Sequence, residues 1–344
     1  MQYQAMKKIY IIAMALSSLI LSSCENDDIM ISSTINFTVD PSYLASSLSV
    51  AEVNPGDLEV LDKDCRLTVD LMIYNQNGEL VESSTERFTN YDVKMKYAAK
   101  KVTEGSYTVL AISHIEDVSD NSTYWEIKNK QKLEGLQVVD AGYIGGQNKI
   151  FGMAYQVVNI TGSSQDIQLK LTPVGSILRV EYYNIHNGWT IADKPITIFQ
   201  LVTNKTSDSF VFSRTGEANV QADSSDDYAW RLDMLYDLDD YSVDNIYSYE
   251  YVLPMNNVRV LFRGYTDEEK YADFGSQYTF NFQSGTSYYA ALDIANDESE
   301  FGKITSSSVA PRKGRQVRIN HPKRLRSLPT YYNLKELKEA AHLQ

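Results

Sequence analysis

The stretch CRLTVDLMIYNQNGELV, residues 65–81, decides the fold class. Apolar and polar side chains alternate from Cys65 to Tyr74, which is the period of a β-strand with one buried face. Asn77-Gly78 then separates this strand from a second apolar segment that starts at Leu80. Because both Asn and Gly adopt positive φ at low cost, an Asn-Gly pair between two such segments predicts a β-hairpin.

Comparable segments recur on both sides of this hairpin, separated by Gly, Pro and Asn. The expected strands are 35–39, 105–112, 167–171, 176–183, 196–202, 210–212, 247–253, 258–263 and 285–294. Residues 117–146 are polar and irregular, so we predict a loop with short turns there. Short strands with turn signals about every 8–12 residues, and no helical period, predict an all-β protein built from β-sandwiches.

The strand pattern restarts after Pro173 and Gly175, which predicts two β-sandwich domains in tandem. Residues 1–23 are assigned to a signal peptide and 24–60 to a tether that contains the strand at 35–39. The N-terminal domain is expected to span 61–171 and the C-terminal domain 172–304, followed by a basic tail over 305–344. The tail is interpreted either as a disordered or loosely docked segment or as a sequence that is not native to the fold.

The formal net charge of the 344 residues is −13, and it is unevenly distributed. The signal segment contributes +2, residues 24–310 contribute −22, and residues 311–344 contribute +7. So acidic a body repels the phosphates of nucleic acids, and we expect no nucleic-acid partner.

The N-terminus carries the pattern of an export signal. Lys7 and Lys8 precede the apolar run 9–21, which has the length of a signal-peptide core and is short for a membrane-spanning helix. The run ends in Leu21-Ser22-Ser23-Cys24, which resembles the lipobox of bacterial lipoproteins. That resemblance implies cleavage before Cys24 and lipidation of its thiol and new amine, and several acyl chains anchor a protein durably. The alternative is an ordinary secretory signal with an incidental cysteine.

The remaining reactive side chains do not predict an enzyme. The histidines, at positions 114, 186, 321 and 342, show no metal-ligand spacing, and no nucleophile elbow or phosphate-binding loop occurs in the sequence. Cys65 lies within an alternating strand, so we expect it to be an unpaired, buried, apolar residue. We expect no catalytic residues, no metal and no cofactor other than the lipid on Cys24.

Two further clusters allow alternative interpretations. Acidic residues gather at positions 223, 226, 227, 233, 237, 239, 240 and 244, which is either a solvated loop or a set of Ca²⁺ ligands, although an EF-hand loop is absent. Tyr247, Tyr249 and Tyr251 share one face of a strand by their period of two, and Tyr288 and Tyr289 follow in a later strand. These tyrosines either pack against another sheet or form a platform on which a glycan stacks.

The order of these features resembles the fimbrillin-like lipoproteins of Bacteroidetes, in particular the minor fimbrial anchor and accessory subunits. The resemblance covers roughly residues 6–300 and rests on the lipobox at Cys24, the acidic residues 25–28, the hairpin 67–81, the segment 104–111 and the restart at 171–180. It implies two transthyretin-like, Greek-key β-sandwiches.

The same resemblance implies a non-enzymatic fimbrial anchor or accessory subunit. It implies lipid anchorage in the outer membrane with exposure at the cell surface, and other fimbrial subunits as partners joined by strand addition. Polymerising relatives lose their N-terminal strand and accept a donated one, whereas anchors keep their lipid. Relatives end their second domain in strands after Ile294, where this chain carries its basic tail. The alternative function is a glycan-binding surface lipoprotein of a polysaccharide-uptake system, and a host-surface ligand is a further candidate partner.

Overall fold

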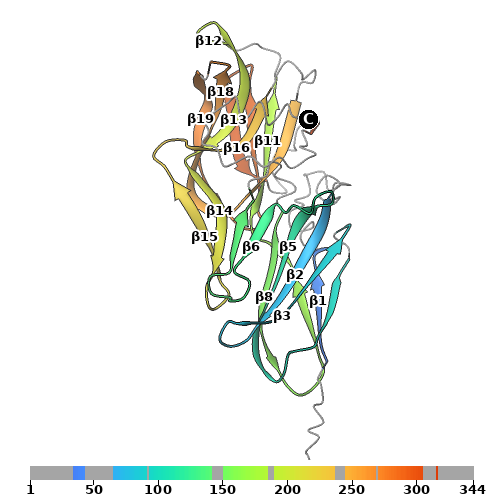
Figure 1. Cartoon of the computed structure of the whole chain (residues 1–344). Helices are drawn as coiled ribbons and strands as arrows, with labels where there is room; N and C mark the ends of the chain where they lie inside the picture. The colour runs from blue at the N-terminus through green and yellow to red at the C-terminus, as the bar shows by residue number, and fades with distance from the viewer. Residues whose placement is uncertain are drawn as a thin grey trace, which may run out of the picture.

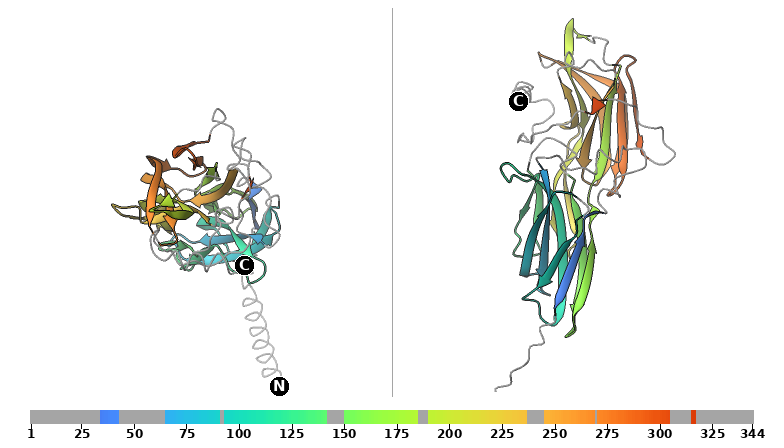
Figure 2. Two further views of the ribbon diagram at one scale, coloured as in Figure 1. Left: turned by 90° about the horizontal axis from the view of Figure 1, so that it is seen from above. Right: turned by 90° about the vertical axis from the view of Figure 1, so that its right-hand side faces the viewer.

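The computed structural model describes residues 34–42, 65–90, 93–141, 150–184, 190–236, 245–268, 270–304 and 315–316. The elements assigned within these ranges are all β-strands. They form two sandwiches that follow one another along the long axis of the molecule (Figures 1 and 2). The expected all-β fold with β-sandwich layers is confirmed.

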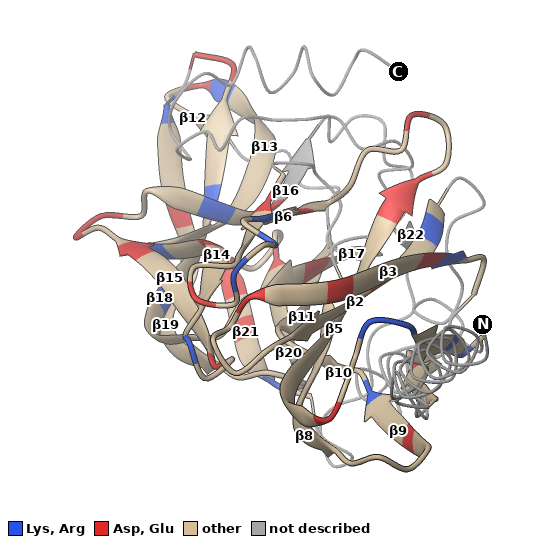
Figure 3. Cartoon of the chain, turned by 60° about the horizontal axis from the view of Figure 1, so that its bottom comes forward, with Lys and Arg blue, Asp and Glu red and all other residues tan. Residues whose placement is uncertain are grey.

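The first sandwich packs a three-stranded sheet, in the order β4-β1-β9, against a five-stranded sheet, in the order β10-β8-β5-β2-β3. The strands of the smaller sheet are β1 (Ile35–Asp40), β4 (Met95–Ala99) and β9 (Gln165–Lys170). The strands of the larger sheet are β2 (Cys65–Tyr74), β3 (Leu80–Phe88), β5 (Gly105–Asp117), β8 (Gly152–Ile160) and β10 (Thr172–Pro173). Acidic and basic residues both occur along β3, at the border of the larger sheet (Figure 3).

The second sandwich repeats this plan with the sheets β12-β13-β18-β19 and β21-β20-β11-β17-β22, and β16 also pairs with β13. The strands of the former sheet are β12 (Thr190–Ile191), β13 (Lys194–Thr203), β16 (Trp230–Tyr236), β18 (Met255–Thr266) and β19 (Tyr271–Phe282). The strands of the latter are β11 (Ser176–Tyr183), β17 (Asn245–Val252), β20 (Ser287–Asp293), β21 (Glu298–Lys303) and β22 (Arg315–Gln316).

Seven strands of the first sandwich have counterparts in the second with the same pairing. In the first, β1 lies between antiparallel β4 and parallel β9; in the second, β11 lies between antiparallel β17 and parallel β20. The opposite sheets also match, because β3-β2-β5-β8 corresponds to β16-β13-β18-β19. β21 and β22 then extend the second sandwich, so strands do follow Ile294 despite the change in composition.

An inserted pair of strands from each half builds a fifth sheet between the sandwiches. Its order is β15-β14-β7-β6, and its strands are β6 (Trp125–Lys128), β7 (Gln137–Asp140), β14 (Lys205–Phe212) and β15 (Ala218–Ser224). Antiparallel pairing of Phe210 with Val138 joins the two halves of the chain. The Phe151 ring contacts the rings of Phe210 and Trp125 edge-to-face, with centroid distances of 5.2 and 5.6 Å. We call this element the bridging sheet.

The sequence predicts most central strands and misses several others. The prediction of a loop over 117–146 is wrong for the part that forms β6 and β7, whose four residues each are too short to show a period. β8, β15 and β19 also lie outside the predicted strands, because much of each is exposed and its apolar pattern is weak.

The hairpin between β2 and β3 closes around one Asn and one Gly. The Asn75 side-chain oxygen accepts hydrogen bonds from the amides of Asn77 and Glu79, at 2.9 and 3.0 Å. Gly78 adopts a φ of +75°, whereas Asn77 is not among the residues with positive φ. The predicted hairpin is therefore confirmed, with the left-handed position at Gly78 alone.

Candidate functional site

The N-terminal strand β1 is the centre of the three-stranded sheet. It is antiparallel to β4, with Phe37 opposite Tyr97, and parallel to β9, with Phe37 opposite Ile167. The side chains of Ile35, Phe37 and Val39 are buried in the core of the first sandwich, and each contributes roughly 1.5–3 kcal/mol of burial free energy. The strand expected at 35–39 is confirmed, and it completes both a sheet and a core.

Charged groups fix the end of β1. Lys94 Nζ lies 2.8 Å from Asp40 Oδ2, and the Ser42 hydroxyl donates a hydrogen bond of 2.5 Å to Asp40 Oδ1. Burial raises the pKa of Asp40, but the hydrogen bonds from Lys94 and Ser42 outweigh it and leave the pKa below its usual value. The backbone of Asp40 also accepts a hydrogen bond of 3.0 Å from the amide of Leu171.

Two kinds of contact can hold a strand in the position of β1. Main-chain hydrogen bonds on both sides supply affinity, and three inward pockets at alternate positions select apolar side chains. Within the described ranges, β4 and β9 have no other strand neighbour, so their positions are defined through β1. The pairing of the β4-β1-β9 sheet therefore depends on β1.

The tyrosines on β17 do not form an exposed platform. Tyr247, Tyr249 and Tyr251 do share one strand face, but all three are buried and belong to the core that continues from the first sandwich. The Tyr251 hydroxyl donates a hydrogen bond of 2.7 Å to the carbonyl of Phe151. The glycan-stacking interpretation of these three residues is wrong, because their face is covered by packing.

A buried cation accompanies these rings. The Arg179 guanidinium lies 3.9 Å from the centre of the Tyr247 ring and 5.9 Å from that of Tyr249. Arg179 Nε is also 2.6 Å from Glu181 Oε1. A cation–π contact in a buried setting is worth about 2 kcal/mol, so these residues serve the packing of β11 on β17.

The cysteines and three of the histidines complete the account of the predicted residues. Cys65 is buried and its thiol is free, as predicted. Cys24, together with the predicted signal peptide, lies outside the described residues, as do His186, His321 and His342. Within the part that the structure describes, no helix is long and apolar enough to cross a membrane.

The acidic residues are spread over different elements. Asp223 lies on β15 of the bridging sheet, whereas Asp233 lies on β16 and accepts a hydrogen bond of 2.6 Å from Ser248. Asp237, Asp239, Asp240 and Asp244 fall outside the described ranges. Among the residues that are described, no group of three or more His, Cys, Asp or Glu side chains is placed to share a metal ion.

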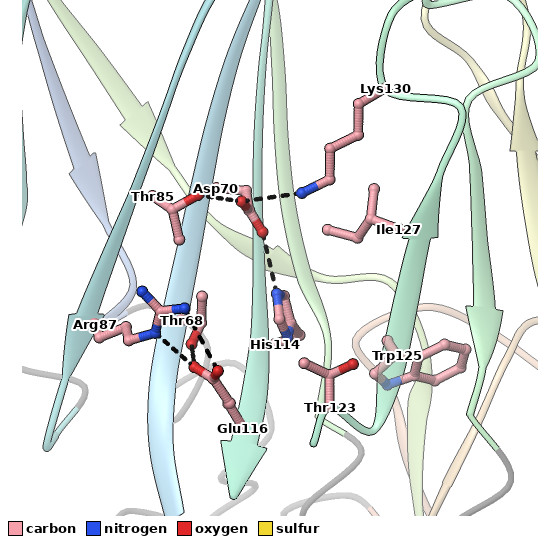
Figure 4. A pocket seen from close by; sticks show the side chains of 10 residues that line it. All are labelled: Thr68, Asp70, Thr85, Arg87, His114, Glu116, Thr123, Trp125, Ile127 and Lys130. Carbon is pink, nitrogen blue, oxygen red and sulfur yellow. Dashed lines mark hydrogen bonds and ion pairs between the residues drawn. The ribbon is translucent and has the colours of Figure 1, made fainter. Parts of the chain in front are cut away.

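The structure reveals a polar cluster that the sequence analysis does not predict. It lies on the face of β2, β3 and β5 that points away from the core, and Figure 4 shows its members. Asp70 lies 3.1 Å from His114 Nε2 and 3.3 Å from Lys130 Nζ, and its Oδ1 accepts a hydrogen bond of 2.5 Å from Thr85. Glu116 accepts hydrogen bonds from Arg66, Arg87 and Thr68 at 3.0, 2.7 and 2.9 Å.

Both carboxylates of this cluster stay ionised at low pH. Burial raises the pKa of Asp70, but the hydrogen bond and charge of His114, with Lys130 and Thr85, lower it to about 2. Burial likewise raises the pKa of Glu116, and Arg66, Arg87 and Thr68 lower it to about 2. Polar residues at alternate positions of β2 are the sequence signal for this cluster. Alternation alone, however, predicts that their face is exposed to solvent, not buried.

No family model and no curated protein matches this sequence. Solved structures resemble the chain at low identity. A Bacteroides thetaiotaomicron protein assigned to polysaccharide binding is 13% identical, with a TM-score of 0.42 over 79% of this chain and 98% of that one. A fimbrial assembly protein of Parabacteroides distasonis is 10% identical, with a TM-score of 0.40 over 79% and 95%. The fimbrial anchor protein Mfa2 of Porphyromonas gingivalis is 11% identical, with a TM-score of 0.40 over 78% and 95%.

Proposed function

We propose that this protein is a non-enzymatic lipoprotein of the cell surface that acts as a fimbrial anchor or accessory subunit and assembles by strand addition. The observation that carries the proposal is the position of β1, which is paired on both sides and supplies three buried side chains to the core. The lipobox-like sequence ending at Cys24 supports attachment to the outer membrane, with the bulk of the chain facing outward.

Deletion of the gene tests the fimbrial role. We expect fimbriae that change in length, number or attachment to the cell, and electron microscopy of negatively stained cells measures all three. Fimbriae that are unchanged in each respect would overturn the proposal. A Cys24→Ser variant tests the anchor separately, because it should abolish incorporation of a radiolabelled fatty acid and release the protein from the membrane fraction.

A disulfide between β1 and β9 distinguishes an anchor from a polymerising subunit. Thr38 and Gln168 are opposite each other in the parallel pairing and point away from the core. In the variant T38C/Q168C, oxidation locks β1 in place. An anchor retains its activity when locked, whereas a subunit that exchanges β1 assembles only under reducing conditions. The single variants T38C and Q168C are the matched controls.

The alternative role in glycan uptake gains nothing from the β17 tyrosines, because they are buried. Purification of the native protein from the cell surface separates the two roles directly. A fimbrial anchor or accessory subunit should bring down pilin subunits, whereas a component of a polysaccharide-uptake system should bring down its transporter.

A further inference from the structure

A hollow of about 200 Å³ opens over the polar cluster of the first sandwich. β2, β3 and β5 form its floor, and Trp125, Ile127 and Lys130, from β6 and the turn that follows it, form its other wall (Figure 4). At about 30 Å³ for each molecule of liquid water, this volume equals six or seven waters. It therefore suits one small ligand with a comparable number of polar atoms.

Two acidic and two basic side chains line the hollow, and Arg66 adds a positive charge beside Glu116 from outside the lining. Asp70 and Glu116 contribute two negative charges to the lining, and Arg87 and Lys130 contribute two positive charges. A free anion entering here meets two carboxylates that remain ionised, and a free cation meets a guanidinium and an ammonium group. A neutral ligand with hydroxyl groups encounters neither repulsion.

The carboxylates are satisfied, whereas one buried ring nitrogen is not. His114 is 4% exposed; its Nε2 lies 3.1 Å from Asp70 Oδ2, and its buried Nδ1 has no hydrogen-bond partner among the described residues. Because a carboxylate only accepts, Nε2 is the donor in this contact, and Nδ1 is left for a ligand. A buried polar atom without a partner costs about 1–3 kcal/mol, which a ligand hydroxyl, able to donate or accept, would recover.

Donors face the same space. Arg87 uses two of its five N–H groups on Glu116, and Lys130 uses one of its three on Asp70. The Thr123 side chain also lines the hollow, and its hydroxyl can both donate and accept. Opposite these groups, Ile127 and the largely buried Trp125 present apolar surface. One polar wall and one apolar wall match a sugar ring, which has hydroxyls at its rim and C–H groups on its faces.

We propose that this hollow binds a single neutral sugar residue, with a sugar hydroxyl hydrogen-bonded to His114 Nδ1 and other sugar oxygens accepting from Lys130 and Arg87. This site is distinct from the β17 tyrosines and independent of strand addition. Failure of sugar binding therefore leaves the fimbrial proposal standing, and normal fimbriae after gene deletion leave the sugar site standing.

Saturation-transfer difference NMR on the purified full chain tests the site with methyl glycosides of glucose, galactose and mannose as probes, and with inorganic phosphate in competition. At least one glycoside should give a saturable signal. K130M should weaken its binding by about tenfold or more, and T123V by about three- to tenfold. K128M is the matched control, since Lys128 is on β6, pairs with Glu126 and does not line the hollow.

Three outcomes would overturn the proposal. They are the absence of a signal from every glycoside at tens of millimolar, binding that survives both K130M and T123V, and displacement of the glycoside by phosphate. The last would identify an anion site. Circular dichroism confirms that each variant is folded. H114Q provides a second test, because it replaces the His114 ring with a polar amide and should also weaken glycoside binding.

Discussion

The hydroxyl of Tyr251 donates a hydrogen bond of 2.7 Å to the backbone carbonyl of Phe151, and so ties β17 of the second sandwich to the chain just before β8 of the first. The amide of Gly175 donates a hydrogen bond of 2.5 Å to the hydroxyl oxygen of Tyr251. Burial raises the pKa of the Tyr251 phenol above its usual value despite these contacts, which keeps the hydroxyl protonated as a donor. One side chain therefore satisfies two backbone groups at the junction of the sandwiches.

Tyr251→Phe should lower the free energy of unfolding by about 1–3 kcal/mol. The substitution keeps the ring but leaves the Gly175 amide without its acceptor. It also removes one of two donors to the Phe151 carbonyl, which still accepts from the Val174 amide. A buried polar group without a partner is costly. Urea denaturation followed by fluorescence measures the loss. Tyr271→Phe, at a residue that is 53% exposed, should change stability by less than about 0.5 kcal/mol. Equal effects of the two variants would contradict the role of Tyr251.

Gly175→Ala should destabilise the same junction. A Cβ at this position would lie 2.7 Å from the Tyr251 ring and 2.7 Å from the carbonyl of Val252, too close for either to be accommodated without a shift of the backbone. We expect a loss of about 1–3 kcal/mol, as for other overpacked sites. Gly162→Ala is the control, because its Cβ meets only the flexible end of the Glu104 side chain. A thermal melt in which the two variants coincide would refute this.

Phe210 tests the bridging sheet. Its side chain is fully buried and contacts the rings of Phe151 and Phe212 at 5.2 and 5.6 Å. Phe210→Ala should cost about 3–5 kcal/mol through lost burial and the resulting cavity, whereas Phe210→Leu should cost less than about 1.5 kcal/mol. Denaturant titration measures both. A loss below about 1 kcal/mol for the alanine variant would show that the bridging sheet is not packed in solution.

The central strands can be predicted from the sequence because their apolar and polar residues alternate between turn residues. β2 and β11 alternate cleanly and end at Gly or Asn, so both were predicted with bounds close to those observed. β6 and β7 could not be predicted, because four residues are too few for a period and their pairing with β14 depends on residues far along the chain.

The polar cluster marks the limit of the same reasoning. Alternation along β2 correctly puts Leu67, Val69 and Leu71 in the core, and by the same rule it would expose Thr68 and Asp70. The inserted β6–β7 segment covers that second face, so Thr68 and Asp70 are buried as well. A tertiary contact of this kind leaves no local signal, so the sequence does not predict this site.

Asp70 should make the free energy of unfolding depend on pH in the acidic range. Its pKa is about 2 in the folded protein against an ordinary 3.8, since the hydrogen bond and charge of His114, with Lys130 and Thr85, outweigh its burial. As the pH falls from 4 to 2, the unfolded chain takes up a proton that the folded chain does not. The stabilisation by ionised Asp70 is therefore complete above about pH 4 and is lost as the pH falls through about 2. Its size is about 2 kcal/mol.

Asp70→Asn removes this dependence at one carboxylate and leaves Glu116, whose pKa is also about 2, in both proteins. Between pH 5 and pH 2 the wild type should therefore lose about 2 kcal/mol more than the variant in urea denaturation. Asp208→Asn, on the exposed part of β14, should follow the wild type. A parallel decline of the wild type and Asp70→Asn would show that the carboxylate is not held by His114 and Lys130 in solution. It would also remove the ionised carboxylate against which the His114 ring is oriented in the proposed sugar site.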